Sequence, residues 1–423
     1  MIVFVIRRYN DVDHLVPIIY GIAKDTNKNI LVICQNPHYD IGNDFRLQFL
    51  KDRYGVRVKY AFNAHMPSLT HKILAKLTCG SYHFKNKNGG SAAKFFYYII
   101  SRMYYKYFDN YIFQNLIVNN YFGEKWAYDF LKGQRVTVII FDFAKGRQYI
   151  TNALFSAAKK LGIITIAVPH GAGMWDLRLL GHNSFDSQEL PDYDVYMMQH
   201  EFRKRVSIQM GVPAEKTAAL GIPRFCNEWQ EILYDITPVT ISGEEREPGE
   251  LRVLYIDRRA RHGMDELSLL ETIKKVSALD FARLLIKPHT RTNHLRVAEL
   301  AKYARITPDI SSVELIKWAD VVIGTTSSIL LEALIQKKTV LLLKYLCDLD
   351  LIIDEMKACL RIDSEDELVD TLREINSGRR TNPYREEDVN ALLKHLVYAD
   401  EEERDVLKAY KDFILGKEKI WRV

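Results

Sequence analysis

The sequence lacks any run of about 20 apolar residues, the length that a membrane-spanning helix needs. Its apolar start, residues 1–6, ends at Arg7-Arg8 and is too short for the core of a signal sequence, so it predicts a buried first strand. Cysteines are few and scattered: five in 423 residues, with no CxxC pair. This argues against a structural zinc site and favours a reducing compartment. We expect a cytoplasmic protein, with peripheral contact at the inner face of the cytoplasmic membrane left open.

The common fingerprints of nucleotide binding and hydrolysis are also missing. No GxGxxG follows the first predicted strand, and no GxxxxGK[ST], GxSxG or HExxH occurs. The net charge of +5, from 59 basic and 54 acidic residues, does not by itself indicate nucleic acid, although it permits an acidic substrate or a membrane surface. An active site must therefore be sought at the ends of the predicted strands.

What the sequence does contain is a regular alternation of short β-branched runs and helical patterns. Its 48% hydrophobic and 27% charged residues are ordinary for a globular protein, and its length predicts two or three domains. Nearly continuous apolar runs are typical of strands buried on both faces of a parallel sheet. In the first half they cover residues 2–6, 30–34, 56–61, 136–141, 163–168 and 194–198. The alternation predicts an α/β fold with an open, doubly wound sheet.

The alternation stops at residues 237–250 and restarts after them, which predicts two domains. Residues 237–250 are polar, with two prolines and two glycines, and form the best candidate linker. We therefore predict a Rossmann-like N-terminal domain over residues 1–236 and a second one, with a helical tail, over residues 251–423. Two such domains would face each other across a cleft, and ligands of open α/β sheets bind at the carboxyl ends of the strands.

Residues 80–132 break the rhythm of the first domain, because they are dense in aromatic residues and lysines and show no clear strand. Core packing of an inserted helical hairpin is the ordinary explanation. The functional alternative is a surface that faces an acceptor or touches a membrane, since Lys with Tyr and Phe suits the boundary between water and lipid head groups.

The strongest local motif follows the predicted strand 321–323. Four hydroxyl residues, Thr325 to Ser328, come directly after Gly324 and open a helix. Free N–H groups and hydroxyl donors at such a place suit a phosphate. Simple capping of the helix by Thr326 or Ser327 is the alternative, although four hydroxyls exceed what one cap needs. Glu332, one turn further on, is either an acceptor for ribose hydroxyls or a solvated charge.

Two other strand ends in the second half carry charge. Lys287, His289 and Arg291 follow one strand, where they would bind an anionic donor or neutralise a leaving phosphate. Asp257 ends the strand 251–256 and is followed by Arg258, Arg259 and Arg261. This cluster is either an ion-paired turn or a catalytic and anion-positioning group, since arginine forks match carboxylate and phosphate oxygens.

In the first half, the segment Val168-Pro-His-Gly-Ala-Gly-Met-Trp-Asp176 follows a strand. Its glycines would let a ligand approach the backbone or form a turn, and His170 and Asp176 are candidates for acid–base catalysis. Asp142 ends the preceding strand and lies at the same edge of the predicted sheet. We expect at least one of these three side chains in the active site.

Together these motifs resemble the GT-B glycosyltransferases. The resemblance rests on the two Rossmann-like halves, on Gly221-Ile-Pro-Arg-Phe225, on Lys287-Pro-His289 and on the strand followed by Thr326-Ser-Ser328. It is best over residues 215–345 and is nearest to bacterial surface-polysaccharide enzymes with CMP- or CDP-activated donors, such as the β-Kdo transferases, the sialyltransferases and the teichoic acid polymer transferases. The opening segment, residues 6–14, also looks like this group.

The resemblance implies roles for particular residues. His289, Ser327 and Ser328 would hold the nucleotide phosphate, although here the histidine follows the proline and Thr290 stands where the His-Pro families have proline. Asp257 resembles the nucleophile of retaining β-Kdo transferases.

The sequence and the resemblance lead us to expect a transferase that moves Kdo, or a similar 2-keto sugar acid, from its CMP donor to a bacterial glycan or lipid-linked glycan. No metal or other cofactor and no nucleic-acid partner are expected, because the cationic strand ends can stabilise the departing CMP. Two alternatives stay open: a polyol-phosphate transferase that uses CDP-glycerol or CDP-ribitol, and a non-catalytic protein that binds nucleotide sugars during polysaccharide assembly.

Overall fold

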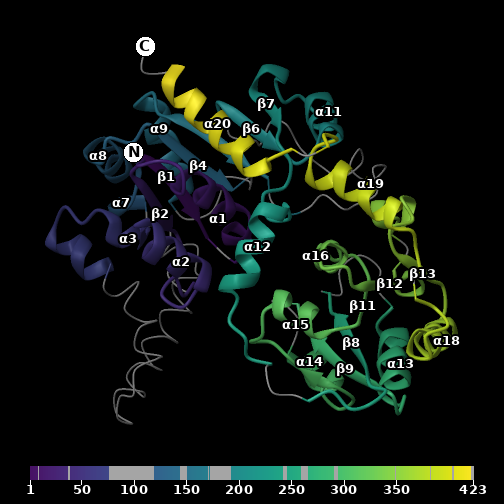
Figure 1. Ribbon diagram of the computed structural model, residues 1–423. Helices are drawn as coiled ribbons and strands as arrows, with labels where there is room; N and C mark the ends of the chain where they lie inside the picture. The colour runs from purple at the N-terminus through teal and green to yellow at the C-terminus, as the bar shows by residue number, and fades with distance from the viewer. Residues whose placement is uncertain are drawn as a thin grey trace, which may run out of the picture. The chain divides into compact units, whose positions relative to one another are not determined.

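The computed structural model describes most of the chain, which divides into two compact units (Figure 1). Unit 1 comprises Met1–Gly171, Phe185–Trp229 and Glu403–Val423, and unit 2 comprises Ala172–Ser184 and Gln230–Glu402. The residues described are 1–7, 9–36, 39–75, 119–142, 150–169, 171, 192–241, 245–258, 265–289, 294–347, 349–381, 383–402 and 404–420.

Unit 1 is built on a seven-stranded sheet in the order β3-β2-β1-β4-β5-β6-β7, and all its strand pairs are parallel. Five of its strands consist entirely of buried residues and have the apolar runs that a sheet covered on both faces requires. The strands are β1 (Ile2–Ile6), β2 (Ile30–Cys34), β3 (Arg57–Tyr60), β4 (Val138–Asp142), β5 (Ile164–Val168), β6 (Val195–Met198) and β7 (Thr217–Ala219). The helices include α1 (Tyr9–Ala23), α2 (Phe45–Tyr54), α3 (Ala61–Ala64), α7 (Asn119–Tyr121), α8 (Glu124–Gly133), α9 (Thr151–Lys160) and α11 (Glu201–Gln209).

Unit 2 repeats the plan with a six-stranded parallel sheet in the order β10-β9-β8-β11-β12-β13. The strands are β8 (Leu251–Ile256), β9 (Ala282–Lys287), β10 (Arg305–Ile306), β11 (Val321–Gly324), β12 (Thr339–Leu343) and β13 (Leu360–Ile362). The helices include α13 (Glu266–Ser277), α14 (His294–Leu300), α15 (Ser312–Trp318), α16 (Ile329–Ile335), α17 (Ile352–Glu355), α18 (Glu365–Asn376) and α19 (Glu386–Val397). In both sheets the order reverses beside the first strand, which is the doubly wound arrangement. The predicted α/β class is confirmed.

The boundary between the units differs from the predicted linker at residues 237–250. It falls after Trp229, inside helix α12 (Asn227–Ile236). The polar stretch instead belongs to unit 2, where the backbone N–H groups of Thr240 and Ile241 donate to the buried carboxylate of Glu314. The polar, Pro/Gly-rich composition therefore marks a surface segment of unit 2. This segment is held by the side chain of Glu314, which lies far away in the sequence.

The C-terminal tail also differs from the expected grouping with residues 251–423. Helix α20 (Val406–Ile420) belongs to unit 1 and packs along α1 (Figure 1). The hydroxyl of Tyr410 donates to the carbonyl of Gly221 over 3.0 Å, and the buried carboxylate of Glu418 accepts from Nζ of Lys28 over 2.6 Å. The last helix of the chain thus belongs to the core of the same unit as the first strand.

The aromatic insertion predicted over residues 80–132 falls largely outside the described residues. Of this range the structure describes residues 119–132, which contain α7 and most of α8. Among the helices that the structure describes, none is both long and apolar enough to cross a membrane.

Candidate functional site

The strand order of unit 2 turns around between β8 and β11, and several predicted site residues gather there. The register pairs Ile256 with Gly324, so Asp257 and Thr325 each come directly after the paired ends of the two strands. The two strands approach closely at this point: a Cβ added to Gly324 would lie 3.4 Å from the carbonyl oxygen of Ile256. Ligands of doubly wound sheets bind outside the carboxyl ends of the strands at such a switch point.

The predicted hydroxyl run lies at this edge, and its four members differ in their contacts. Oγ of Ser327 accepts from the backbone N–H of Ile329 over 3.3 Å, so this serine does cap the helix. Ser328 occupies the N-cap position of α16 without a capping bond from its side chain. The hydroxyls of Thr325 and Thr326 are buried and have no hydrogen-bond partner among the described residues. Buried hydroxyls are normally paired, so these two donors indicate a ligand position.

Asp257 is fully buried and is held by an arginine that sequence reasoning did not identify. Its carboxylate has no exposed surface and accepts from the guanidinium of Arg296, in α14, over 2.7 Å. Arg296 also bonds Glu266, in the first turn of α13, over 3.0 Å. The predicted neighbour Arg258 is half-buried, and burial lowers the pKa of its guanidinium. The ion pair of Asp257 with Arg296 joins the end of β8 to α14, and the bond from Arg296 to Glu266 extends it to α13.

Lys287, at the end of β9, makes contacts other than those predicted. Its ammonium donates to the backbone carbonyls of Thr307, Pro308 and Ile310 and so fixes the connection between β10 and α15. Burial lowers its pKa to about 8, and among the described residues no carboxylate forms an ion pair with it. Lys287 thus braces the edge of the sheet and also brings to it a positive charge, on which the nearby carboxylate of Asp309 acts more weakly than burial does.

Two further predicted residues belong to the same unit. His289 follows β9 and is half-buried. Glu332 lies in α16 and is completely buried, and its carboxylate accepts from the hydroxyl of Ser312 over 3.4 Å. The alternative of a solvated helix charge is therefore wrong for Glu332.

Asp142 ends β4 in unit 1, beside β1, which is the corresponding switch point of that sheet. The guanidinium of Arg7, at the end of β1, forms an ion pair with Asp142 and another with Asp11 in α1. Sequence reasoning placed Asp142 at this edge but missed Arg7. Arg291, His170 and Asp176 lie outside the described residues, so their predicted roles stay predictions.

Gly171, which follows His170 in the sequence, is anchored in unit 1 by two hydrogen bonds. The backbone N–H of Gly171 donates to Nε2 of the buried His14 over 3.1 Å, and its carbonyl accepts from the side-chain amide of Gln199 over 3.1 Å. Its φ of +81° is a conformation that favours glycine. The glycine predicted to form a turn or to admit a ligand therefore adopts a turn conformation, fixed by side chains of α1 and the end of β6.

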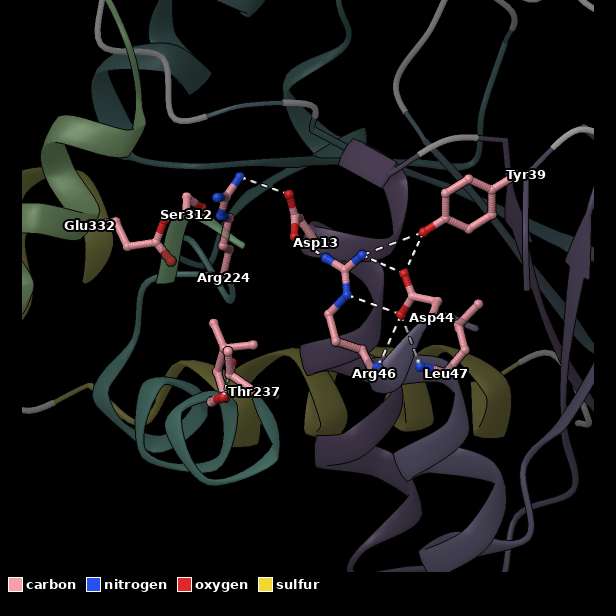
Figure 2. A network of polar contacts seen from close by, with 10 residues as sticks. Asp13, Tyr39, Asp44, Arg46, Leu47, Arg224, Thr237, Ser312 and Glu332 are labelled. Carbon is pink, nitrogen blue, oxygen red and sulfur yellow. Dashed lines mark hydrogen bonds and ion pairs between the residues drawn. The ribbon is translucent and has the colours of Figure 1, made fainter. Parts of the chain in front are cut away.

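A buried arginine forms the centre of a polar network in unit 1 (Figure 2). Arg46, in α2, is 1% exposed and donates to Asp44, which caps the same helix, and to Asp13 in α1. Asp44 also accepts from the hydroxyl of Tyr39, and Arg224 pairs with Asp13 over 3.0 Å. Burial works to raise the pKa of Asp44, but Arg46 outweighs it and the pKa is lowered. The network joins two motifs of the predicted resemblance, the opening segment and Gly221-Ile-Pro-Arg-Phe225.

Comparison of the sequence with known proteins finds neither a protein-family model nor a curated protein that matches. Comparison of the structure finds solved structures with a similar fold over nearly the whole chain. UDP-GlcNAc 2-epimerase from Neisseria meningitidis, bound to UDP-GlcNAc, has 11% sequence identity and a TM-score of 0.51, with 99% of each chain covered. A glycosyltransferase from Rickettsia africae has 12% identity and a TM-score of 0.52, with 100% of this chain and 98% of the other covered.

A third similar structure is that of MnaA from S. aureus with UDP, at 10% identity and a TM-score of 0.52, with 100% of this chain and 96% of the other covered. At such low identity the likeness concerns the fold. It confirms the predicted GT-B-type architecture of two tandem Rossmann-like units.

Proposed function

We propose that the chain is an enzyme that acts on a nucleotide sugar and transfers the sugar to a glycan acceptor. The observation that carries the proposal is the pair of buried hydroxyls on Thr325 and Thr326, which lack partners among the described residues and follow β11 at the switch point of unit 2. Hydroxyl donors at this edge suit the phosphates of a nucleotide. Similar folds that hold UDP-GlcNAc or UDP support the same class of ligand.

For the donor we propose CMP-Kdo or a related CMP-activated sugar acid. Such a donor carries both a phosphate and a sugar carboxylate, and the edge of unit 2 offers the charge of Lys287 together with Arg258 and His289. Cations aimed at a departing phosphate stabilise the charge that develops on it. Arg291 is assigned to the same group, and Glu332 to the ribose, on the sequence motif alone.

In the proposed retaining reaction, a carboxylate oxygen of Asp257 attacks the anomeric carbon while the bond from that carbon to the phosphate oxygen breaks and CMP leaves. The acceptor hydroxyl then displaces Asp257 and gives its proton to a base, for which Asp142, His170 and Asp176 are the candidates. Asp257 must first release Arg296, because its carboxylate has no exposed surface while the pair is formed.

The nucleotide part of the proposal is tested by calorimetry with CMP on Thr325→Val and Thr326→Val, which keep the side-chain shape and remove the hydroxyl. Loss of both hydrogen bonds should weaken binding by roughly 1–3 kcal/mol. Thr371→Val, a buried threonine in α18 of the same unit, is the matched control and should bind CMP as the wild type does. Unchanged affinity in the double variant would remove the hydroxyls from the site.

The donor is tested by turnover of CMP-Kdo, CDP-glycerol and UDP-GlcNAc in parallel. Release of CMP from CMP-Kdo alone supports the proposal. Turnover of CDP-glycerol would instead support the polyol-phosphate transferase, and conversion of UDP-GlcNAc without an acceptor would support an epimerase like the structural neighbours. Binding of a donor without any turnover would support the non-catalytic alternative.

The nucleophile is tested by mass spectrometry of the intact protein after incubation with the donor. A sugar adduct on the peptide that contains Asp257, absent from Asp257→Asn, would establish the covalent step. An adduct on Asp142 or Asp176 would move the role to that residue. No adduct, together with inversion at the anomeric carbon, would leave Asp257 as the partner of Arg296.

A further inference from the structure

Exposed apolar side chains gather on unit 1 where the chain enters and leaves residues 76–118. Leu69 is 72% exposed, Ile73 50%, Met66 39% and Tyr121 38%. These four make up half of the large hydrophobic residues that are exposed in the described part of the chain. We call this group the apolar face.

The members of the apolar face are held together by local contacts. Residues 69–75 are helical, and Leu69 and Ile73 are spaced by four residues and so share one side of the helix. Between them in sequence, Nε2 of His71 lies 2.7 Å from the carbonyl oxygen of Tyr121, and the two rings are in edge contact with centroids 5.8 Å apart. The two stretches that flank residues 76–118 in the sequence are therefore held beside each other.

The apolar face stands on a rigid aromatic base. Phe122 is buried, and its ring contacts those of Phe62, His71 and Trp126 with centroid separations of 4.8 to 5.5 Å. The indole N–H of Trp126 donates to the carbonyl of His65 over 2.8 Å. Because the base is packed, the exposure of Leu69 and Ile73 is not a consequence of a loosely held helix.

The charge of the chain between the two ends indicates what this face meets. Residues 66–123 contain seven lysines and arginines and a single acidic residue, Asp109, which gives +6. The whole chain carries +5, so all the other residues together sum to −1. Residues 76–118 also contain twelve tyrosines and phenylalanines. Exposed Lys72 among exposed aliphatic side chains, on a stretch that continues in sequence into a basic and aromatic-rich one, matches an anionic bilayer, whose head groups attract lysine and whose interface accommodates aromatic rings.

We propose that the apolar face of unit 1 docks on the surface of an anionic phospholipid membrane, with Leu69 and Ile73 inserted between head groups and Lys72 paired with lipid phosphates. This placement would bring an enzyme of the proposed class to a lipid-linked acceptor. The docking itself does not depend on the proposed function, because it is measured without a donor.

The test is flotation of the full chain with vesicles of phosphatidylcholine mixed with phosphatidylglycerol, and with vesicles of phosphatidylcholine alone. The wild type should float with the anionic vesicles only and should be released by added salt. Leu69→Ser combined with Ile73→Ser should abolish flotation, and Lys72→Glu should weaken it by about fivefold or more. Leu267→Ser combined with Leu295→Ser is the matched control, since these leucines of unit 2 are 80% and 78% exposed, and it should float as the wild type does.

Three results would overturn the proposal. The Leu69 and Ile73 variant floating like the wild type would show that the face does not meet the lipid. Equal flotation with both kinds of vesicle would show that charge plays no part. A lower melting temperature of this variant with unchanged flotation would show that other residues of the chain cover the face. Donor turnover in solution should be the same in the variant and the wild type, so failure of docking and failure of the proposed enzyme activity are separate results.

Discussion

Arg46 shows how one buried charge can organise several segments of unit 1. Its guanidinium is 1% exposed, and its hydrogen bonds reach the cap of its own helix and an aspartate of α1. A charge removed from water is tolerated only when it is paired and its hydrogen bonds are satisfied. Asp13, Asp44 and Tyr39 meet this requirement together, with Arg224 as the second cation.

Arg46→Met should therefore lower the free energy of unfolding by about 3–5 kcal/mol, because the buried carboxylates of Asp13 and Asp44 lose their common partner. Arg53→Met is the matched control, since Arg53 lies on the exposed side of the same helix and should change stability by less than about 0.5 kcal/mol. Urea unfolding of both variants measures the difference. Similar values for the two would show that the network adds nothing to stability.

Lys287 predicts a pH dependence at the candidate nucleotide site. Burial lowers the pKa of Lys287 to about 8. Its side chain is therefore a charged ammonium below this pH and a neutral amine above it. An anionic ligand favours the charged form, and CMP affinity should therefore be full below pH 8 and fall as the pH rises through that value. The effect on folding has the opposite sign. Between pH 8 and about pH 10.4 the unfolded lysine still holds its proton whereas the folded one has lost it, so the cost of burying the charge disappears. The free energy of unfolding should therefore rise with pH over this range.

Calorimetry with CMP between pH 7 and pH 9.5 measures the effect on binding. Lys287→Arg is the control, because arginine stays charged throughout and should remove the decline. If CMP affinity still declines with rising pH in Lys287→Arg, the titrating group is another residue.

At the scale of elements, strands with long apolar runs could be predicted from the sequence, whereas two short strands could not. Each of β1, β2 and β8 was predicted with its observed bounds, because four or five consecutive apolar or β-branched residues leave few alternatives. The strands β7 and β13 were missed, since each has only three residues and pairs at or near the end of its sheet. Their backbone pairing, and not their side chains, makes them strands.

Helix α20 is the element whose place the sequence could not predict. Its partners Lys28 and Asp25 lie almost four hundred residues earlier, and only tertiary packing brings them together. The contact is close at one point, where a Cβ added to Gly21 of α1 would lie 3.1 Å from Cβ of Leu407. The glycine admits the neighbouring helix, and no local pattern in either helix indicates this.

Leu407→Ala should accordingly destabilise unit 1 by about 2–5 kcal/mol, because Leu407 is 1% exposed and leaves a cavity against α1. Lys408→Ala, on the exposed side of the same helix, should have little effect. Hydrogen exchange resolved by peptide is the measurement, and the loss of protection should appear in α1 and α20. Loss confined to unit 2 would contradict the assignment of α20 to unit 1.

At the scale of the whole molecule, the sequence predicted the repeated doubly wound plan and the edge of unit 2 where site residues gather. It did so because parallel strands and their carboxyl ends follow from the order of elements along the chain. It did not predict the contacts of Asp257 with Arg296 or of Lys287 with three carbonyls, because the sequence shows which residues follow a strand but not which groups their side chains meet.

This organisation predicts that a nucleotide acts on the two units unequally. A ligand that binds only the folded state stabilises it by about 2.7 kcal/mol at a concentration one hundred times its dissociation constant. If CMP binds at the switch point of unit 2, amides of β8, β11 and α16 should gain protection from hydrogen exchange on this scale, whereas those of β1 and β4 should gain less. Exchange measured with and without CMP, in the wild type and in the Thr325→Val and Thr326→Val double variant, gives the comparison. Equal gains in both sheets, or a gain that survives in the double variant, would place the nucleotide outside the edge formed by β8 and β11.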